Sequence, residues 1–322
     1  MVEFGDLRPM LAQRLRSPFN SPDHMFEVKW DGYRALAYVT PRGVRYQSRQ
    51  GKDLSESFPS LSRCPVGFPA HGAVVDGEIV SMVGQRSSFH HLRQGRGHLV
   101  YVAFDLLLAG DGLSLMDRPW HERRRHLEDG WVESPAWSLS PVVAEQGEWL
   151  WQIITQQGLE GMVAKTKSGP YLAGQRSGHW VKVSHRKTLD CVIVSVLVAG
   201  SGRISSVGVA VYDAKRLHYL GQVGSGLSQQ TLRRIRDQLK TTPEAMVSNP
   251  PDDALLWTVP TLVCTVEYLE ITPRGRLRHP VFCRLRPELS PSDCHWPKGG
   301  TWDKDKVSGQ DRPAQLPPDQ CP

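Results

Sequence analysis

Apolar residues in this chain fall mostly into short runs typical of β-strands, and helical spacing is confined to a few segments. Helices are expected at 119–127 and at 146–157, where Trp149, Ile153 and Ile154 share one face and should be buried. The lead-in, 1–24, is interrupted by prolines and has room for one short helix near 11–15. Strands are expected where β-branched and aromatic residues cluster between turn residues, at 25–28, 35–39, 44–48, 73–82, 99–108, 159–166 and 179–183.

The pattern changes after residue 187. One amphipathic helix is expected at 229–239, with Leu232, Ile235 and Leu239 on one face. Five strands surround it, at 188–198, 207–212, 217–223, 261–271 and 277–285, and this order suits a small Greek-key barrel, the OB-fold. We therefore expect an α+β chain with antiparallel sheets in domain 1–187, an OB-fold barrel in 188–296, and a disordered, proline-rich tail in 297–322.

Composition narrows the class of protein. The chain has 322 residues, a formal net charge of +6 and a sequence pI near 9.0, which favours an anionic partner. Its six cysteines are scattered without a C-x-x-C pair, so neither a zinc site nor a disulfide framework is expected. Apolar runs are too short to cross a bilayer and the N-terminus lacks a signal pattern, so we expect a cytoplasmic protein with no membrane partner. We also expect the protein to be a monomer.

Lys29 is the most suggestive single residue in the sequence. It ends the apolar strand 25–28, and Asp31-Gly32 is expected to be the tight turn of a hairpin leading to 35–39. A lysine at a strand end can face a pocket, where an ammonium is costly unless it pairs or loses its proton, and a neutral amine is a nucleophile. The same residues fit an ordinary hairpin with an exposed lysine equally well.

Further charged residues lie at the ends of other strands in the first domain. Asp76 and Glu78 interrupt the strand 73–82, and a hairpin turn there is the alternative interpretation. Adjacent His90 and His91 diverge on either a strand or a helix, so a metal site there is disfavoured. Carboxylates and cations together indicate phosphoryl or nucleotidyl transfer, in which cations neutralise phosphate charge and carboxylates hold a metal. The set comprises Glu27, Asp31, Glu78 and Glu160 with Lys29, Arg34, Arg49, Lys165 and Lys182.

At these residues the chain resembles a known family. The segment from Lys29 to Arg34 matches the K-x-D-G-x-R signature of covalent nucleotidyltransferases, which comprise DNA ligases, RNA ligases and mRNA capping enzymes. The segment 277–282 (LRHPVF) resembles bacterial ATP-dependent DNA ligases of the end-joining and repair type. Companion segments follow in the family's order: Ser48-Arg49-x-Gly51, Asp76-Gly77-Glu78, Phe104-Asp105-Leu106-Leu107, Glu160 to Lys165 and Trp180-Val181-Lys182. The resemblance covers Arg8 to about Pro287.

The resemblance implies a role for each matching residue. Lys29 would form the lysyl-AMP phosphoramidate, Glu27 would contact adenine, and Phe104 would stack on the ring. The remaining implied contacts are Arg34 and Glu78 to the ribose, Lys165 and Lys182 to the α-phosphate, Arg49 to the phosphate of the nick, and Asp31 and Glu160, with Glu78, to the metal. The implied substrates and cofactors are ATP, Mg²⁺ or Mn²⁺, and nicked double-stranded DNA, with the end-binding protein Ku as a partner. The basic loop 86–96 would add phosphate contacts.

Two departures from the family pattern concern the first chemical step. Ser184 stands where a second lysine is common, and the barrel segment reads Arg286-Pro287-Glu288-Leu289 in place of R-x-D-K. In relatives this segment orients pyrophosphate during lysine adenylation, so slow self-adenylation is expected. The alternatives are an RNA ligase, a capping-type nucleotidyltransferase, or a nick-binding protein that does not adenylate itself.

Overall fold

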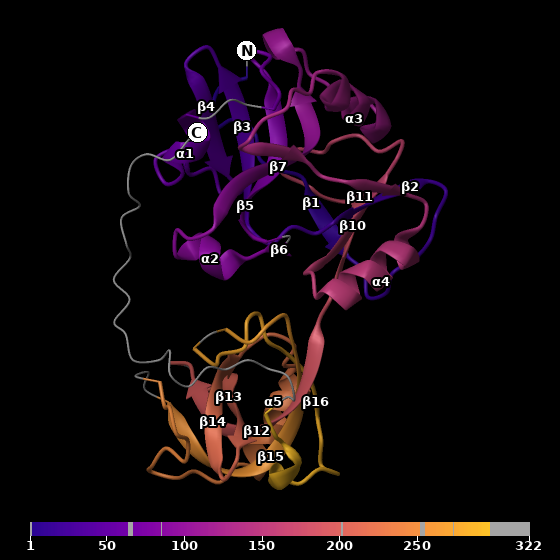
Figure 1. The fold of residues 1–322 in the computed structure, drawn as a ribbon. Helices are drawn as coiled ribbons and strands as arrows, with labels where there is room; N and C mark the ends of the chain where they lie inside the picture. Colours follow the sequence, from indigo (N-terminus) through magenta and orange to yellow (C-terminus); the bar gives the residue numbers. More distant parts are fainter. Residues whose placement is uncertain are drawn as a thin grey trace. The chain divides into compact units, whose positions relative to one another are not determined.

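The computed structural model describes residues 2–63, 67–84, 86–200, 202–251, 255–272 and 274–296 (Figure 1). The chain divides into two compact units, one ending at His185 and the other beginning at Arg186, two residues before the expected boundary. The tail expected to be disordered, 297–322, lies outside the described residues. No helix in the described part of the chain is long and apolar enough to cross a membrane.

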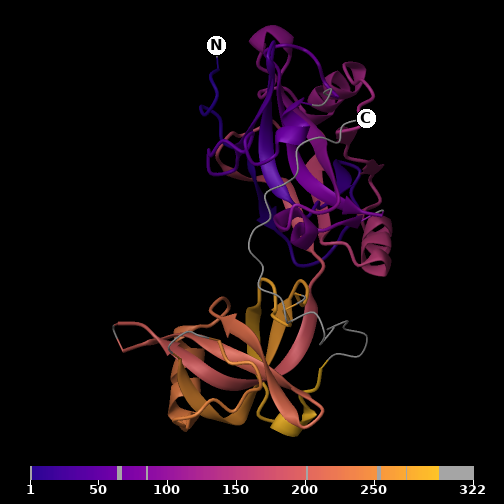
Figure 2. The same ribbon diagram turned by 60° about the vertical axis from the view of Figure 1, so that its left-hand side comes forward.

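Two mixed, mainly antiparallel sheets build the first unit (Figures 1 and 2). The first sheet has the order β1 (Leu11–Arg14), β11 (Arg176–Ser184), β10 (Gly161–Thr166), β2 (His24–Val28) and β9 (Val142–Ala144). The second sheet has the order β4 (Gly43–Ser48), β3 (Tyr33–Thr40), β5 (Val74–Val83), β7 (His98–Leu108) and β8 (Trp137–Leu139), with β6 (Arg86–Ser87) paired to β5. Only β1–β11 and β7–β8 pair in parallel among these strands.

Helices cover the sheets of this unit, and both long helices lie where their spacing predicted. The α3 helix (Trp120–Asp129) packs against β7, and α4 (Gly147–Gln157) packs on β2 and β10 through Leu150 and Ile154. Trp149 was expected to be buried, but its side chain is 51% exposed, because Leu150 and Ile154 form the inner face. The shorter helices are α1 (Pro59–Arg63), α2 (Phe89–Arg93) and the 3₁₀ turn η1 (Gly110–Gly112).

The prediction of a hairpin turn at Asp31-Gly32 is wrong. The strand β2 pairs with β9 and β10, whereas β3 pairs with β4 and β5, so this dipeptide carries the chain from one sheet to the other. Glycine is required at this crossing, because a Cβ on Gly32 would lie 2.1 Å from the carbonyl oxygen of Ile79. Lys29 therefore lies at a junction between two sheets rather than at a hairpin.

Two further local predictions are corrected. Residues 11–14 form the strand β1 rather than a short helix, because their backbone pairs with β11, whose sequence lies more than 160 residues away. The segment Asp76-Gly77-Glu78 lies inside the continuous strand β5 and is not a turn. Gly77 allows this, since a Cβ there would lie 2.6 Å from the carbonyl oxygen of Val102 on β7.

The second unit is the expected OB-fold barrel. Its strand order is β14 (Arg216–Val223), β13 (Ile204–Asp213), β12 (Lys187–Val198), β15 (Leu256–Tyr268) and β16 (Val281–Leu285). The ends of this sheet meet where Ser225 bridges Val281 and accepts a hydrogen bond from the Phe282 N–H (2.8 Å). Helix α5 (Gln229–Gln238) inserts Ile235 into the core, and the turn η2 (Pro291–Asp293) follows β16. The strand expected at 277–285 begins only at Val281.

Candidate active site

A pocket in the first unit is lined by side chains from both sheets. The first sheet and its flanks contribute Leu11, Ala12, Glu27, Val28, Lys29, Trp30, Val163, Lys165, Arg176, Trp180 and Lys182. The second contributes Arg34, Arg49, Glu78 and Phe104. Residues that are far apart in the sequence meet here because strand ends from two sheets face one space. The pocket collects every residue expected to contact the nucleotide, whereas Asp31 and Glu160 are not among its lining residues.

Lys29 follows β2 directly, and its backbone N–H donates to the carbonyl oxygen of Gly161 (2.8 Å). This bond extends the pairing of β2 with β10 and aligns Lys29 with Glu160, the residue before β10. The Lys29 ammonium donates a hydrogen bond to the Glu160 carboxylate, with the two side chains 23% and 14% exposed. A primary amine is thus fixed at the pocket, accessible and next to a carboxylate that can take up a proton.

Positive charge gathers around Lys29. Burial lowers the pKa of Lys182 below its usual value, and the neighbouring charges of Lys29, Arg176 and Arg49 lower it further. These side chains therefore share one electrostatic environment, which an anion with several negative charges would stabilise. Arg176 was missed by the sequence reasoning, because residues 168–177 have the composition of a turn, and only the pairing of β11 with β1 brings it to the pocket.

Arg34 is held rigidly at another wall of the pocket. Its Nε and Nη2 donate to the two oxygens of buried Asp76, each at 2.6 Å. The Tyr171 hydroxyl donates to Asp76 Oδ2 (2.6 Å) and accepts from the Met10 N–H (2.9 Å). The guanidinium lies 4.7 Å from the ring centroid of Phe104. The bidentate pair fixes the orientation of Arg34 before any ligand binds.

Lys165 and Glu27 form a buried ion pair in the same pocket. The Lys165 ammonium donates to Glu27 Oε1 (2.7 Å) and to the carbonyl oxygen of Phe104 (3.1 Å). Its nitrogen also lies 4.4 Å from the Phe104 ring centroid and 4.5 Å from that of Trp180. Burial lowers the pKa of Lys165 below its usual value, and the Glu27 carboxylate opposes this shift. Lys165 was expected at the α-phosphate, but here its ammonium points toward Glu27 and Phe104.

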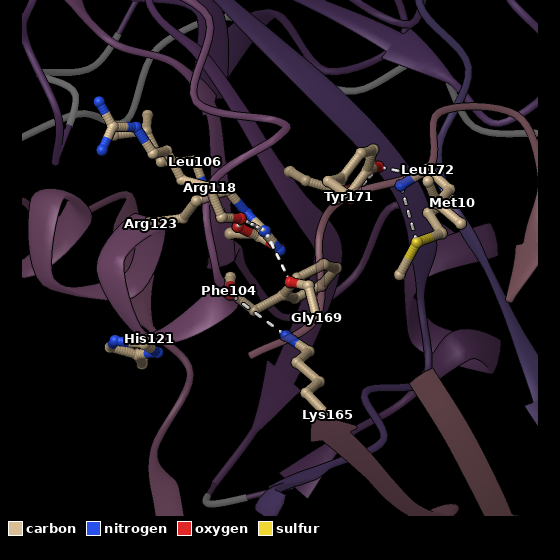
Figure 3. A network of polar contacts seen from close by, with 12 residues as sticks. Met10, Phe104, Leu106, Arg118, His121, Arg123, Lys165, Gly169, Tyr171 and Leu172 are labelled. Atoms are coloured by element: carbon tan, nitrogen blue, oxygen red, sulfur yellow. Dashed lines mark hydrogen bonds and ion pairs between the residues drawn. The ribbon is translucent and has the colours of Figure 1, made fainter. Parts of the chain in front are cut away.

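A second ion pair lies behind Phe104. Arg123 from α3 donates through Nε and Nη2 to the two oxygens of Asp105, each at 2.8 Å, and both side chains are fully buried. Its Nη1 donates to the carbonyl oxygens of Arg118 (2.6 Å) and Gly169 (3.0 Å) (Figure 3). Four hydrogen bonds therefore tie β7, α3 and the loop after β10 together, next to the residue whose ring lines the pocket.

Glu160 and Glu78, two carboxylates close to Lys29, could share a divalent cation with the phosphates of a nucleotide. Burial raises the pKa of Glu78 to about 8, against the opposing charges of Lys29 and Arg34. No group of three or more His, Cys, Asp or Glu side chains able to hold a metal occurs among the described residues. Mg²⁺ commonly binds through one or two carboxylates plus substrate phosphates and water, so Glu160 with Glu78 nearby fits such an ion when a nucleotide is present.

Arg286 is the cation of the barrel segment 286–289. Arg286 donates through Nη1 to both oxygens of Asp190 (2.9 and 3.0 Å) and through Nε to Glu288 (2.6 Å). The neighbouring Leu289, which stands where the family resemblance implies a lysine, packs against an apolar cluster of the barrel that includes Val192 and Tyr219. The substituted side chain thus has a packing role, while the arginine is held by two carboxylates.

The fold and this pocket define a nucleotidyltransferase core followed by an OB-fold barrel. A family model described as "ATP dependent DNA ligase domain" matches residues 9–184, and one described as "ATP dependent DNA ligase C terminal region" matches 200–289. The chain belongs to the ATP-dependent DNA ligase family.

Curated relatives and solved structures agree with this assignment. "Multifunctional non-homologous end joining protein LigD" of Mycobacterium bovis is 32% identical over 91% of the chain, which spans 40% of that relative's length. "DNA ligase C1" of Mycolicibacterium smegmatis is 30% identical over 89% of the chain and 92% of its own length. The ligase domain of M. tuberculosis LigD superposes with a TM-score of 0.52 at 29% identity, covering 92% of this chain and all of that one. A mycobacterial DNA ligase D solved with ATP gives 0.53 at 29% identity, covering 91% and 99%.

Proposed function

We propose that this protein seals nicks in double-stranded DNA with ATP, through a covalent adenylate on Lys29. The observation that carries the proposal is the fixed amine of Lys29 beside Glu160, facing a pocket that also holds Arg49, Arg176 and Lys182. A nucleophile, a proton acceptor and a cluster of cations are the groups that nucleotidyl transfer requires.

The proposed reaction has three balanced steps. In the first, the Lys29 amine loses a proton and attacks the α-phosphorus of ATP, so that an N–P bond forms and the bond to pyrophosphate breaks. In the second, the 5′-phosphate of the nick attacks the same phosphorus, the N–P bond breaks, and AMP moves to the DNA. In the third, the 3′-hydroxyl attacks the DNA phosphate, releases AMP and loses its proton. Glu160, which accepts a hydrogen bond from the Lys29 ammonium, would accept the proton that Lys29 releases.

The nucleotide contacts follow from the walls of the pocket. Phe104 offers a ring for stacking on adenine, and Arg34, oriented by Asp76 and lying against that ring, would contact the ribose. Lys182 would contact the α-phosphate and Arg49 the phosphate of the nick. Glu160, Asp31 and Glu78 are the residues proposed to hold Mg²⁺ or Mn²⁺, which when bound would neutralise phosphate charge.

The biological setting is proposed from the relatives. The name of the LigD proteins assigns them to non-homologous end joining, so we propose that this chain acts in DNA repair in the cytoplasm, as a monomer, with Ku as a partner. The chain spans 40% of the length of that LigD, so the proposal extends to DNA ligation alone.

A sealing assay tests the proposed function. The protein is mixed with ATP, Mg²⁺ and a labelled duplex carrying one nick in DNA, with a nicked RNA duplex and an RNA 5′-end as alternative substrates. Sealing of the DNA nick supports the proposal, and product only with RNA would replace it with an RNA ligase or capping activity. Sealing of a pre-adenylated DNA nick without any ATP-dependent sealing would show that only the first step, self-adenylation, is lost.

A further inference from the structure

The buried pair of Lys165 and Glu27 has no place in the three chemical steps above. Each side chain is only 2% exposed, yet both line the pocket. An ammonium has three N–H donors, and Lys165 donates one hydrogen bond to Glu27 and one to the carbonyl oxygen of Phe104. Figure 3 shows the bond to Phe104. Its nitrogen also lies against the rings of Phe104 and Trp180. The Lys165 ammonium is therefore held against the part of the pocket formed by Phe104 and Trp180.

The cations that share the environment of Lys29 are different ones. Arg49, Arg176 and Lys29 act on the charge of Lys182, and all four line the pocket. The pocket thus has a cationic region suited to phosphates and a separate aromatic region. Among the described residues that line the pocket, Glu27 is the carboxylate that pairs with a lysine in the aromatic region. A flat base stacked on Phe104 would bring its edge to Glu27.

We propose that Lys165 is a positioning residue that selects adenine, by holding Glu27 so that its second oxygen, Oε2, accepts the amino group at C6 of the purine. The proposal rests on the proposed function, since it concerns the nucleotide that this site binds. A carboxylate is an acceptor only, so it matches the amino group of adenine and repels the carbonyl oxygen that guanine and hypoxanthine carry at C6. Lys165 fixes the carboxylate, and Glu27 makes the contact.

Base discrimination tests this role. The rate constant of self-adenylation divided by the nucleotide KM is measured with ATP and with purine riboside 5′-triphosphate, which lacks any group at C6. Lys165→Met keeps the length of the apolar stem and removes the charge. We expect this variant to lose roughly tenfold of the wild-type preference for ATP, the range for a hydrogen bond to a charged group. Because both nucleotides are tested on one preparation, the ratio does not depend on the fraction of protein that is folded.

A matched control separates base selection from phosphate binding. Lys182→Met removes a cation from the phosphate region, so both rates should fall while their ratio stays within about twofold of wild type. If Lys165→Met also lowered both rates by one factor, Lys165 would be a phosphate contact and the proposal would be overturned. If Lys165→Met does not fold, Lys165→Gln retains a donor for Glu27 and should give an intermediate ratio; an unchanged ratio contradicts the proposal.

A double-mutant cycle tests whether Lys165 acts through Glu27. Glu27→Gln should itself lower the preference for ATP, and adding Lys165→Met should then change the ratio little further. Independent, additive losses would mean that Lys165 contacts the base directly, against the proposal. If wild type forms no covalent adenylate, the proposed function fails, and the base preference is then measured as the ratio of equilibrium dissociation constants, which tests Lys165 separately.

Discussion

The ammonium of Lys29 donates a hydrogen bond to the carboxylate of Glu160, between the end of β2 and the start of β10. The pair joins two residues that are 131 positions apart, and the backbone bond from the Lys29 N–H to the Gly161 carbonyl oxygen fixes its geometry. In the free protein the amine is therefore held in place but engaged as a donor. Before it can attack phosphorus it has to lose a proton and leave this partner.

Glu160→Gln should slow self-adenylation by about a hundredfold, because an amide cannot accept the proton that Lys29 releases. Single-turnover formation of the protein adenylate, measured against pH, checks this. The sealing of a pre-adenylated nick provides the comparison step, since it needs no charging of Lys29. Equal rates of self-adenylation in the variant and in wild type would remove Glu160 from the first step.

Tyr171→Phe should raise the KM for ATP severalfold and destabilise the fold by about 1–2 kcal/mol, because Asp76 loses the hydroxyl that helps to orient it toward Arg34. Asp76→Asn should have the larger effect on both quantities, since it removes the charge that pairs with Arg34. Urea unfolding and initial rates measure the two effects. A Tyr171→Phe protein with normal stability and KM would show that Asp76 needs no support from the tyrosine.

Arg123→Met should lower the free energy of unfolding by about 3–5 kcal/mol, because it leaves the fully buried Asp105 carboxylate without its partner. The double variant with Asp105→Asn should recover part of this loss, since the uncompensated charge is gone. Chemical denaturation of the three proteins measures both changes. A loss below 1 kcal/mol in the single variant would contradict a structural role for the pair behind Phe104.

The contribution of Glu78 to the stability of the free protein should fall as pH rises from about 4.5 to about 8. Burial raises the pKa of Glu78 to about 8, so the folded protein keeps this proton to a higher pH than the unfolded chain does. The contribution is fully present below the unfolded pKa and is lost as the folded group ionises, at no more than about 1.4 kcal/mol per pH unit. Glu78→Gln should flatten the profile in chelator-treated protein; an unchanged slope would rule out this group.

The short sequence patterns identified most of the pocket, because strand ends in one domain can face only a few spaces. Pairing between distant segments was not predictable from local spacing. The strand β1 exists because its partner β11 lies far along the chain, and Arg176 reaches the pocket through the same pairing. Likewise, Gly32 is required because the carbonyl oxygen of Ile79 leaves no space for a Cβ. The ion pair of Lys165 with Glu27 forms because β10 pairs with β2.

Transfer of labelled AMP to the protein and onward to DNA tests the central claim most directly. The wild-type protein, incubated with ATP labelled at the α-phosphate and a divalent cation, should acquire label in an acid-labile bond on Lys29. Addition of nicked duplex should then move the label to the 5′-phosphate. Lys29→Ala should acquire no label yet should still seal a pre-adenylated nick. Label on the Lys29→Ala protein, or ATP-dependent sealing by it, would contradict the assignment of Lys29 as the nucleophile.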